Sequence, residues 1–251
     1  MRQIIVNADD FGINTDVTSA IEYEIELGKV SSTTVMANGS CLDEVKRFAD
    51  LHPEVSFGVH LCLSEFDSLT KSEGLKQAGL VNEEGKFIHK AIFKVKDLKD
   101  ELVRRAIRDE LNAQIDVVSS LGFQISHADS HHHVHTIDPL KSLFVEVLHH
   151  RGISKIRLGG GFHTLRMRLH LSLWLQRNRL NKYYKNQLTT TDDFYSYADF
   201  LDAGCPLFDG MTVELLCHPG HKGKNYLSEI QRMEETALPT DIKLISYYEL
   251  H

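Results

Sequence analysis

The stretch from Ser126 to His135 holds the highest density of chemically reactive side chains in the sequence. Five of the fifteen histidines lie in it, beside Asp129. Imidazole is a common metal ligand and the side chain whose charge changes most readily near neutral pH, so the cluster indicates a metal site or a proton-transfer site. The alternative is a polar loop whose histidines face water, and the stretch by itself leaves both open.

The apolar pattern around this stretch predicts alternating strands and helices. Short apolar or β-branched runs indicate buried strands, whereas apolar residues recurring every three or four positions indicate helices. The expected strands are residues 3–6, 30–36, 55–61, 123–128, 153–158, 188–191, 211–217 and 242–245, and the expected helices are about 15–27, 42–51, 98–121, 138–151, 162–186, 194–201 and 226–236. Such alternation predicts a parallel α/β sheet, and seven or eight repeats favour a distorted (β/α) TIM-like barrel.

One barrel domain of this kind would account for residues 1–251. Within it, the periodicity lapses at about 64–90, a charged segment that is too long for an ordinary connection. We expect a lid-like insertion there. The three glycines from Gly159 to Gly161 lack the Lys-Ser/Thr of a phosphate-binding loop, so they predict a turn.

Catalytic side chains of such barrels come from the carboxyl ends of different strands. The expected strand ends carry Asp9 and Asp10, His60, Asp129 and His131, and His218. One carboxylate with two imidazoles leaves coordination positions open for water and substrate, so Asp10, His60 and His131 would suit a hydrolytic metal site. Asp9 could then accept a proton from the attacking water, and His218 could protonate a leaving amine.

Four collinear segments resemble the motifs of the YdjC-like carbohydrate deacetylases, the group that contains chitooligosaccharide deacetylase. The segments are Asn7 to Gly12, Gly58 to Leu61, Asp129 to His135 and Glu214 to Gly220, and the match extends to residues 246–250. The resemblance implies a distorted barrel that removes acetyl groups from N-acetylated amino sugars, such as chitooligosaccharides or N,N'-diacetylchitobiose, with one divalent metal ion.

The same resemblance implies a role for each matching residue. Asp10, His60 and His131 become metal ligands, Asp9 the base and His218 the acid, although either carboxylate of the Asp9–Asp10 pair could face the metal. Asp129, His133, His135 and Arg157 would orient the ligands or contact substrate. His132 would point away if its stretch is extended, though a turn would change that. Two imidazoles favour zinc, whereas the carboxylate and open positions also permit magnesium.

Two regions depart from the family pattern. Between Ser64 and Lys90 only residues 68–70 and 85–87 resemble the family, with serine where proline is usual, and from 159 to 191 the match is thin. Both regions are where substrate would be gripped, so the identity of the sugar stays open.

Composition narrows the class of protein further. The net charge of −7 argues against nucleic-acid binding, no segment is apolar enough to span a membrane, and the four cysteines form no C-x-x-C pair. We therefore expect a cytoplasmic enzyme with reduced thiols, a small saccharide as its partner, and possible homodimers. The rival functions are a metallophosphoesterase, which would need two metals and more carboxylates, and a non-catalytic sugar- or metal-binding barrel, against which Asp9 and His218 argue.

Overall fold

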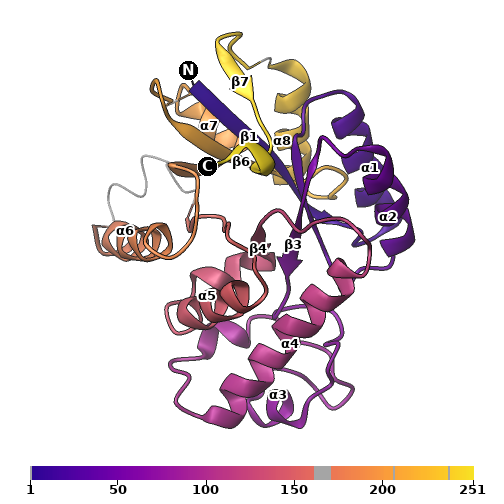
Figure 1. Ribbon diagram of the computed structural model, residues 1–251, viewed down its shortest axis with the longest axis vertical. Coiled ribbons are helices and arrows are strands. Elements are labelled where there is room, and N and C mark those ends of the chain that lie inside the picture. The colour runs from indigo at the N-terminus through magenta and orange to yellow at the C-terminus, as the bar shows by residue number, and fades with distance from the viewer. Residues whose placement is uncertain (1, 161–170, 206, 237) are drawn as a thin grey trace.

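A single parallel sheet organises the computed structural model, which describes residues 2–160, 171–205, 207–236 and 238–251 (Figure 1). Its strands are β1 (Arg2–Phe11), β2 (Ser32–Val35), β3 (Ser56–Leu61), β4 (Ala128–Ser130), β5 (Asp193–Ser196), β6 (Thr212–Cys217) and β7 (Ile242–Leu244). They lie in the order β4-β3-β2-β1-β6-β5, and β7 pairs with β1. Every pairing among these strands is parallel. Neighbouring strands therefore present their carboxyl ends at one edge of the sheet.

The sheet curls into a half-barrel, so the expected α/β fold with a distorted barrel is confirmed. Two single parallel bridges, Ala128 with Ile156 and Lys155 with Thr189, continue the pairing beyond β4 toward the chain that leads into β5. The strands expected at 153–158 and 188–191 are therefore reduced to these bridges. Gly152, with a φ of 70°, and the turn at Gly160, with a φ of 74°, leave only a short extended segment between them.

Helices follow the strands and cover the sheet. They are α1 (Thr15–Glu26), α2 (Leu42–Leu51), α3 (Glu73–Gln77), α4 (Glu101–Ser119), α5 (Lys141–His150), α6 (Leu171–Lys185), α7 (Tyr197–Asp202) and α8 (Lys224–Glu235), with short 3₁₀ helices η1 (Ile92–Lys94), η2 (His131–Thr136) and η4 (Tyr247–Glu249). Figure 1 shows α1 and α2 on one side of the strands and α4 and α5 near β3 and β4. Their apolar faces and the strands form one large buried core.

Local signals explain where the helices begin and where one expectation was wrong. The Asn14 side chain accepts a hydrogen bond from Val17 N at 3.0 Å and starts α1, as an N-cap does. The helix expected at 194–201 is instead β5 followed by α7, whose N-cap is Ser196. Here Phe194 and Tyr195 pair with β6 and form a strand before the helix begins. Of the helix expected at 162–186, residues 162–170 lie outside the described residues, and the rest is found as α6.

The segment at 64–90 is a folded excursion that contains α3 and two antiparallel bridges, Asp67 with Lys86 and Val81 with Phe87. It is anchored on α4, because the buried Glu110 carboxylate accepts hydrogen bonds from Leu69 N and Thr70 N at 3.0 and 2.9 Å. This anchoring fixes the segment beside the carboxyl end of β3.

No helix in the described part of the chain has both the length and the apolar character required to cross a membrane.

Candidate active site

Two neighbouring carboxylates at the end of β1 face different partners. The register between β1 and β2 shifts between Ala8 and Phe11, and Asp10 adopts a φ of 70°, in the left-handed region that few non-glycine residues occupy. Asp9 and Asp10 are both buried, with exposed fractions of 2%. The irregular backbone turns Asp9 toward an arginine and Asp10 toward a group of histidines. The two adjacent carboxylates therefore have different binding partners.

Three imidazoles converge on Asp10. Its Oδ1 lies 2.9 Å from His131 Nδ1 and 3.2 Å from His60 Nε2, and its Oδ2 lies 3.1 Å from His221 Nε2. Burial alone would raise the pKa of Asp10, but the hydrogen bonds from the three imidazoles hold it well below its usual range. We call Asp10 with His60, His131 and His221 the histidine side of the site.

His60, at the end of β3, is held from behind by a second carboxylate. Its Nδ1 lies 2.6 Å from Asp129 Oδ1, and Thr34 Oγ1 donates to the other Asp129 oxygen at 3.2 Å. Burial would lower the pKa of His60, but the charges of Asp129 and Asp10 outweigh burial and raise it well above its usual range. A carboxylate behind a histidine ring is the arrangement that orients metal-binding histidines in proteins.

The histidine side fits a divalent cation. Asp10, His60 and His131 each offer one ligand atom, and these atoms all lie within 4.8 Å of one another. One carboxylate and two imidazoles form a donor set that suits zinc and similar metals and leaves other coordination positions open. The overlapping group Asp9, His60 and Asp129 is also close together. It fits less well, because a guanidinium already neutralises both of its carboxylates.

That guanidinium is Arg157, which is fully buried and binds three carboxylates. Its two terminal nitrogens each donate to one Asp9 oxygen at 2.7 Å. The terminal nitrogen Nη1 also lies 2.5 Å from Asp129 Oδ2, and Nε lies 2.7 Å from Glu214 Oε1. The guanidinium also lies 5.0 Å from the centre of the Phe194 ring. We call Arg157 with Asp9, Asp129 and Glu214 the arginine side of the site.

The carboxylates on the arginine side differ in ionisation. Burial would raise the pKa of Asp9, but the charge of Arg157 overcomes that effect and lowers it far below its usual range, so Asp9 stays ionised. Burial dominates at Glu214 and raises its pKa to about 7. Tyr247 donates a hydrogen bond of 2.5 Å to Glu214 Oε2, which holds this carboxyl group in place.

A further hydrogen-bonded chain supports Asp9 from the core. Asn7 Nδ2 donates to Asp9 Oδ1 at 2.8 Å, Asn7 Oδ1 lies 3.2 Å from His127 Nε2, and the His127 ring stacks on Tyr247 at a centroid separation of 3.6 Å. Gly58 makes room for this ring, since a Cβ there would lie 2.5 Å from it. Asp9 is therefore fixed from two directions.

The remaining predicted site histidines lie at different depths. His218, at the end of β6, is partly buried, and its ring packs edge-on against His221 at 5.6 Å. His133 packs edge-on against the Phe194 ring at 5.8 Å, and burial, followed by the charge of Arg157, lowers its pKa to about 3. His135 is fully buried with Nδ1 2.5 Å from Ser130 Oγ, so it supports the core behind the site.

Comparisons with known proteins identify the family of the chain. A model of the YdjC-like protein family matches residues 3–249. The chain belongs to the YdjC-like protein family. A carbohydrate deacetylase from Geobacillus stearothermophilus is 33% identical over 251 residues, which cover 98% of this chain and 92% of the relative. A chitooligosaccharide deacetylase from Klebsiella pneumoniae is 27% identical over 87% of this chain and 81% of the relative.

Among solved structures, a suggested cellobiose-phosphate cleavage protein from Enterococcus faecalis superposes with a TM-score of 0.71. It is 22% identical and covers 99% of this chain and 98% of its own. At that identity the likeness shows the fold alone.

Several groups in this YdjC-like site were not predicted as site residues: His221, Glu65, Thr34, Glu214 and Tyr247. His221 had a signal, since it follows His218 by three residues across a turn at Gly220, whose φ is 78°. Glu65 had none, because it lies in the segment at 64–90 and reaches His131 Nε2 at 3.4 Å only in the folded chain.

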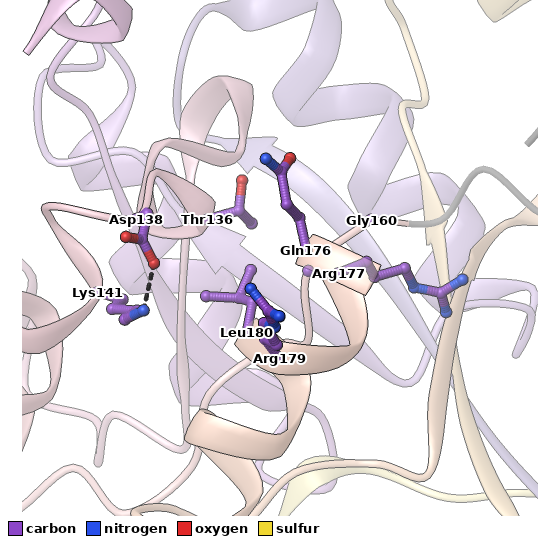
Figure 2. Close-up of a pocket in the computed structure, with 9 residues that line it drawn as sticks. Thr136, Asp138, Lys141, Gly160, Gln176, Arg177, Arg179 and Leu180 are labelled. Atoms are coloured by element: carbon purple, nitrogen blue, oxygen red, sulfur yellow. Dashed lines mark hydrogen bonds and ion pairs between the residues drawn. The ribbon is translucent and has the colours of Figure 1, made fainter. Parts of the chain in front are cut away.

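A cavity of about 580 Å³ is lined in part by residues that closely follow site residues in the sequence (Figure 2). Its lining is Thr136, Asp138, Lys141, Gly159, Gly160, Gln176, Arg177, Arg179 and Leu180. Thr136 follows His135, and Gly159 is two residues beyond Arg157. Figure 2 shows Lys141 paired with Asp138 on one side and Arg177 directed away from them. Six of its nine lining residues have polar or charged side chains, and the apolar lining includes Leu180.

Proposed function

We propose that this protein is a metal-dependent hydrolase that removes the acetyl group from N-acetylated amino sugars, with a short oligosaccharide or disaccharide as substrate. The observation that carries the proposal is that the two adjacent aspartates at the end of β1 have different partners. Asp10 shares a cation-binding donor set with His60 and His131, while the adjacent Asp9 is held ionised by Arg157. The names of the relatives, carbohydrate deacetylase and chitooligosaccharide deacetylase, support the same reaction and substrate class.

In this mechanism Asp9 is the general base. A divalent cation held by Asp10, His60 and His131 would supply Lewis acidity to the acetyl carbonyl and would make a water molecule more acidic. Arg157 and Asn7 aim the Asp9 carboxylate and keep it unprotonated. Its low pKa makes Asp9 a weak base on its own, so it removes a proton only from a water of raised acidity as that water attacks the carbonyl carbon.

His218 is the general acid of the proposal. It lies at the end of β6, the strand that pairs with β1 along the residues leading to Asp9. The C–N bond of the acetamide breaks only if the nitrogen leaves as an amine, because an amide anion is a very poor leaving group. His218 supplies that proton, and acetate and the free amino sugar are released. His133, neutral because of its low pKa, is suited to a hydrogen bond with substrate rather than to proton transfer.

The cavity of Figure 2, in which six of the nine lining residues have polar or charged side chains, supports a saccharide substrate. Its volume of about 580 Å³ lies within the usual range of small-molecule sites. The rival metallophosphoesterase is less well supported, because Asp129 and Glu214, the carboxylates that could hold a second metal at the strand ends, are bound by Arg157.

Acetate release from a panel of N-acetylated saccharides, with Zn²⁺ or Mg²⁺ restored to chelator-stripped protein, tests the proposal. We expect Asp10→Asn to lose activity on the order of 10³-fold and Asp9→Asn or His218→Gln to lose roughly 10²- to 10⁴-fold in kcat. His150→Ala, an exposed histidine on α5, serves as the matched control and should keep full activity. A folded Asp10→Asn protein that releases acetate as fast as the parent would exclude this function.

A further inference from the structure

A second cluster of metal-binding side chains lies outside the proposed catalytic group. Glu65, His89 and His132 each offer one ligand atom, and these atoms all lie within 4.8 Å of one another. Glu65 and His89 come from the two ends of the segment at 64–90, and His132 comes from η2. The cluster therefore joins that segment to the histidine stretch that follows β4.

The arrangement of Glu65 links this cluster to the histidine side without merging the two. Its Oε1 lies 3.0 Å from His89 Nδ1, whereas its Oε2 lies 3.4 Å from His131 Nε2. One carboxylate oxygen thus faces each group. The carboxylate can serve a cation at His89 and at the same time orient His131, as carboxylates behind metal-binding histidines do.

The backbone of η2 turns His132 toward the segment at 64–90. His132 and His133 both have a φ of 53°, so the expected alternation of an extended stretch is replaced by a tight turn. His132 Nδ1 lies 2.9 Å from Ser64 Oγ, which leaves Nε2 as the ring nitrogen available to a cation. The His132 ring packs edge-on against His89 at 5.4 Å. The positive φ values of Phe66 and Lys90, which flank Glu65 and His89, show that the backbone is bent at both ends of the segment.

We propose that Glu65, His89 and His132 form a second cation site, of the type that takes Zn²⁺ or a similar transition metal. Two imidazoles and one carboxylate are such a donor set. In a tetrahedral zinc site the ligand atoms are roughly 3.4 Å apart, given metal–ligand distances of about 2.0–2.1 Å, so small side-chain rotations close the cluster around an ion. The side chains of His89 and Glu65 are 54% and 36% exposed, which provides an open entry path.

A cation at this site would tie the segment at 64–90 to η2. The segment is already anchored on α4 through the hydrogen bonds from Leu69 N and Thr70 N to Glu110. A second attachment at His132 would join both ends of the segment, at Glu65 and His89, to η2 and hold it beside the proposed catalytic group. Binding at the second site should therefore order the segment even in a protein whose first site cannot bind.

The test is a Zn²⁺ titration of chelator-stripped protein. Binding is measured by calorimetry or by competition with a chromophoric chelator. We expect two equivalents in the parent, and one in Asp10→Asn, which disables only the first site. His89→Ala and His132→Ala should weaken one of the two equivalents by at least about tenfold and leave the other unchanged. His150→Ala is the matched histidine control and should bind as the parent does.

Hydrogen exchange gives a second measurement that does not depend on catalysis. In the Asp10→Asn protein, added Zn²⁺ should slow exchange in residues 64–90, and His89→Ala in the same background should abolish the effect. A parent that binds one equivalent, lost in Asp10→Asn, would overturn the second site and leave the proposed function intact. Unchanged stoichiometry and affinity in both His89→Ala and His132→Ala would overturn it as well.

Discussion

The arginine side and the histidine side of the site meet at β1 but are built on opposite principles. On the arginine side, one fully buried guanidinium binds three carboxylates at 2.5–2.7 Å, and each of these carboxylates has another hydrogen-bond partner in the core. On the histidine side, one carboxylate faces three imidazoles, and two of those rings, His131 and His221, are 11% and 19% exposed.

The difference shows how one pair of adjacent aspartates can take two roles. A carboxylate that is already paired with a permanently charged guanidinium does not need a metal ion to neutralise it. Its position and ionisation are therefore set by the fold. A carboxylate surrounded by imidazoles can exchange their protons for a metal ion, because a neutral imidazole nitrogen is itself a ligand. The fold thus holds Asp9 in place, whereas Asp10 is available to bind a metal ion.

The largest effect that distinguishes the two sides is the loss of the buried guanidinium. We expect Arg157→Gln to destabilise the protein by about 3–5 kcal/mol, because three carboxylates would remain buried around a neutral side chain. Urea unfolding monitored by circular dichroism measures this change. The matched control is Arg108→Gln, which removes a partly exposed arginine 3.5 Å from Glu146 and should cost at most about 1 kcal/mol. Equal costs for the two variants would contradict the contrast drawn above.

The order of the elements and the strand ends that carry chemistry could be predicted, since both depend on local patterns. Apolar periodicity reveals strands and helices, and in a parallel sheet the ends of β1, β3, β4 and β6 must lie at one edge. The structure accordingly brings Asp10, His60 and His131 together. The brief strands at 153–158 and 188–191 were overestimated, because an apolar run shows that a segment is buried but not how many of its hydrogen bonds are to a neighbouring strand.

The contacts of Arg157 and the direction of His132 could not be predicted. Arg157 and its partner Asp9 are 148 residues apart, and which carboxylate a buried arginine selects depends on how far the sheet curls. His132 is directed outward by two consecutive residues with a φ of 53°, a conformation that histidine does not signal in a sequence. Glu65 reaches the site from a segment without periodicity, so nothing local marked it.

A smaller effect should come from substitution of Asp129, a carboxylate that contacts both sides of the site. It lies 2.6 Å from His60 Nδ1 and 2.5 Å from the Arg157 guanidinium. Asp129→Asn should weaken cation binding at Asp10, His60 and His131 by about 10- to 100-fold, because the His60 ring loses the charge that orients it. Arg157 keeps Asp9 and Glu214, so the loss of stability should be smaller than in Arg157→Gln. Calorimetric cation titration measures the affinity, and Asp116→Asn, a surface carboxylate 2.7 Å from Arg151, is the control that should bind normally.

The smallest effect concerns the ionisation of Glu214 on the arginine side. Burial raises its pKa from 4.5 to about 7, so the folded protein holds a proton there that the unfolded chain has released. The resulting stability is fully present below pH 4.5 and is lost as the pH rises through about 7. Glu214→Gln keeps the hydrogen-bonding shape but cannot titrate, so its Tm relative to the parent should rise by a few degrees between pH 5 and pH 7.5. Thermal unfolding across this range measures the difference, with the exposed Glu146→Gln as control. A difference in Tm that stays constant with pH would mean that Glu214 is ionised throughout, and that Arg157 dominates all three of its carboxylates equally.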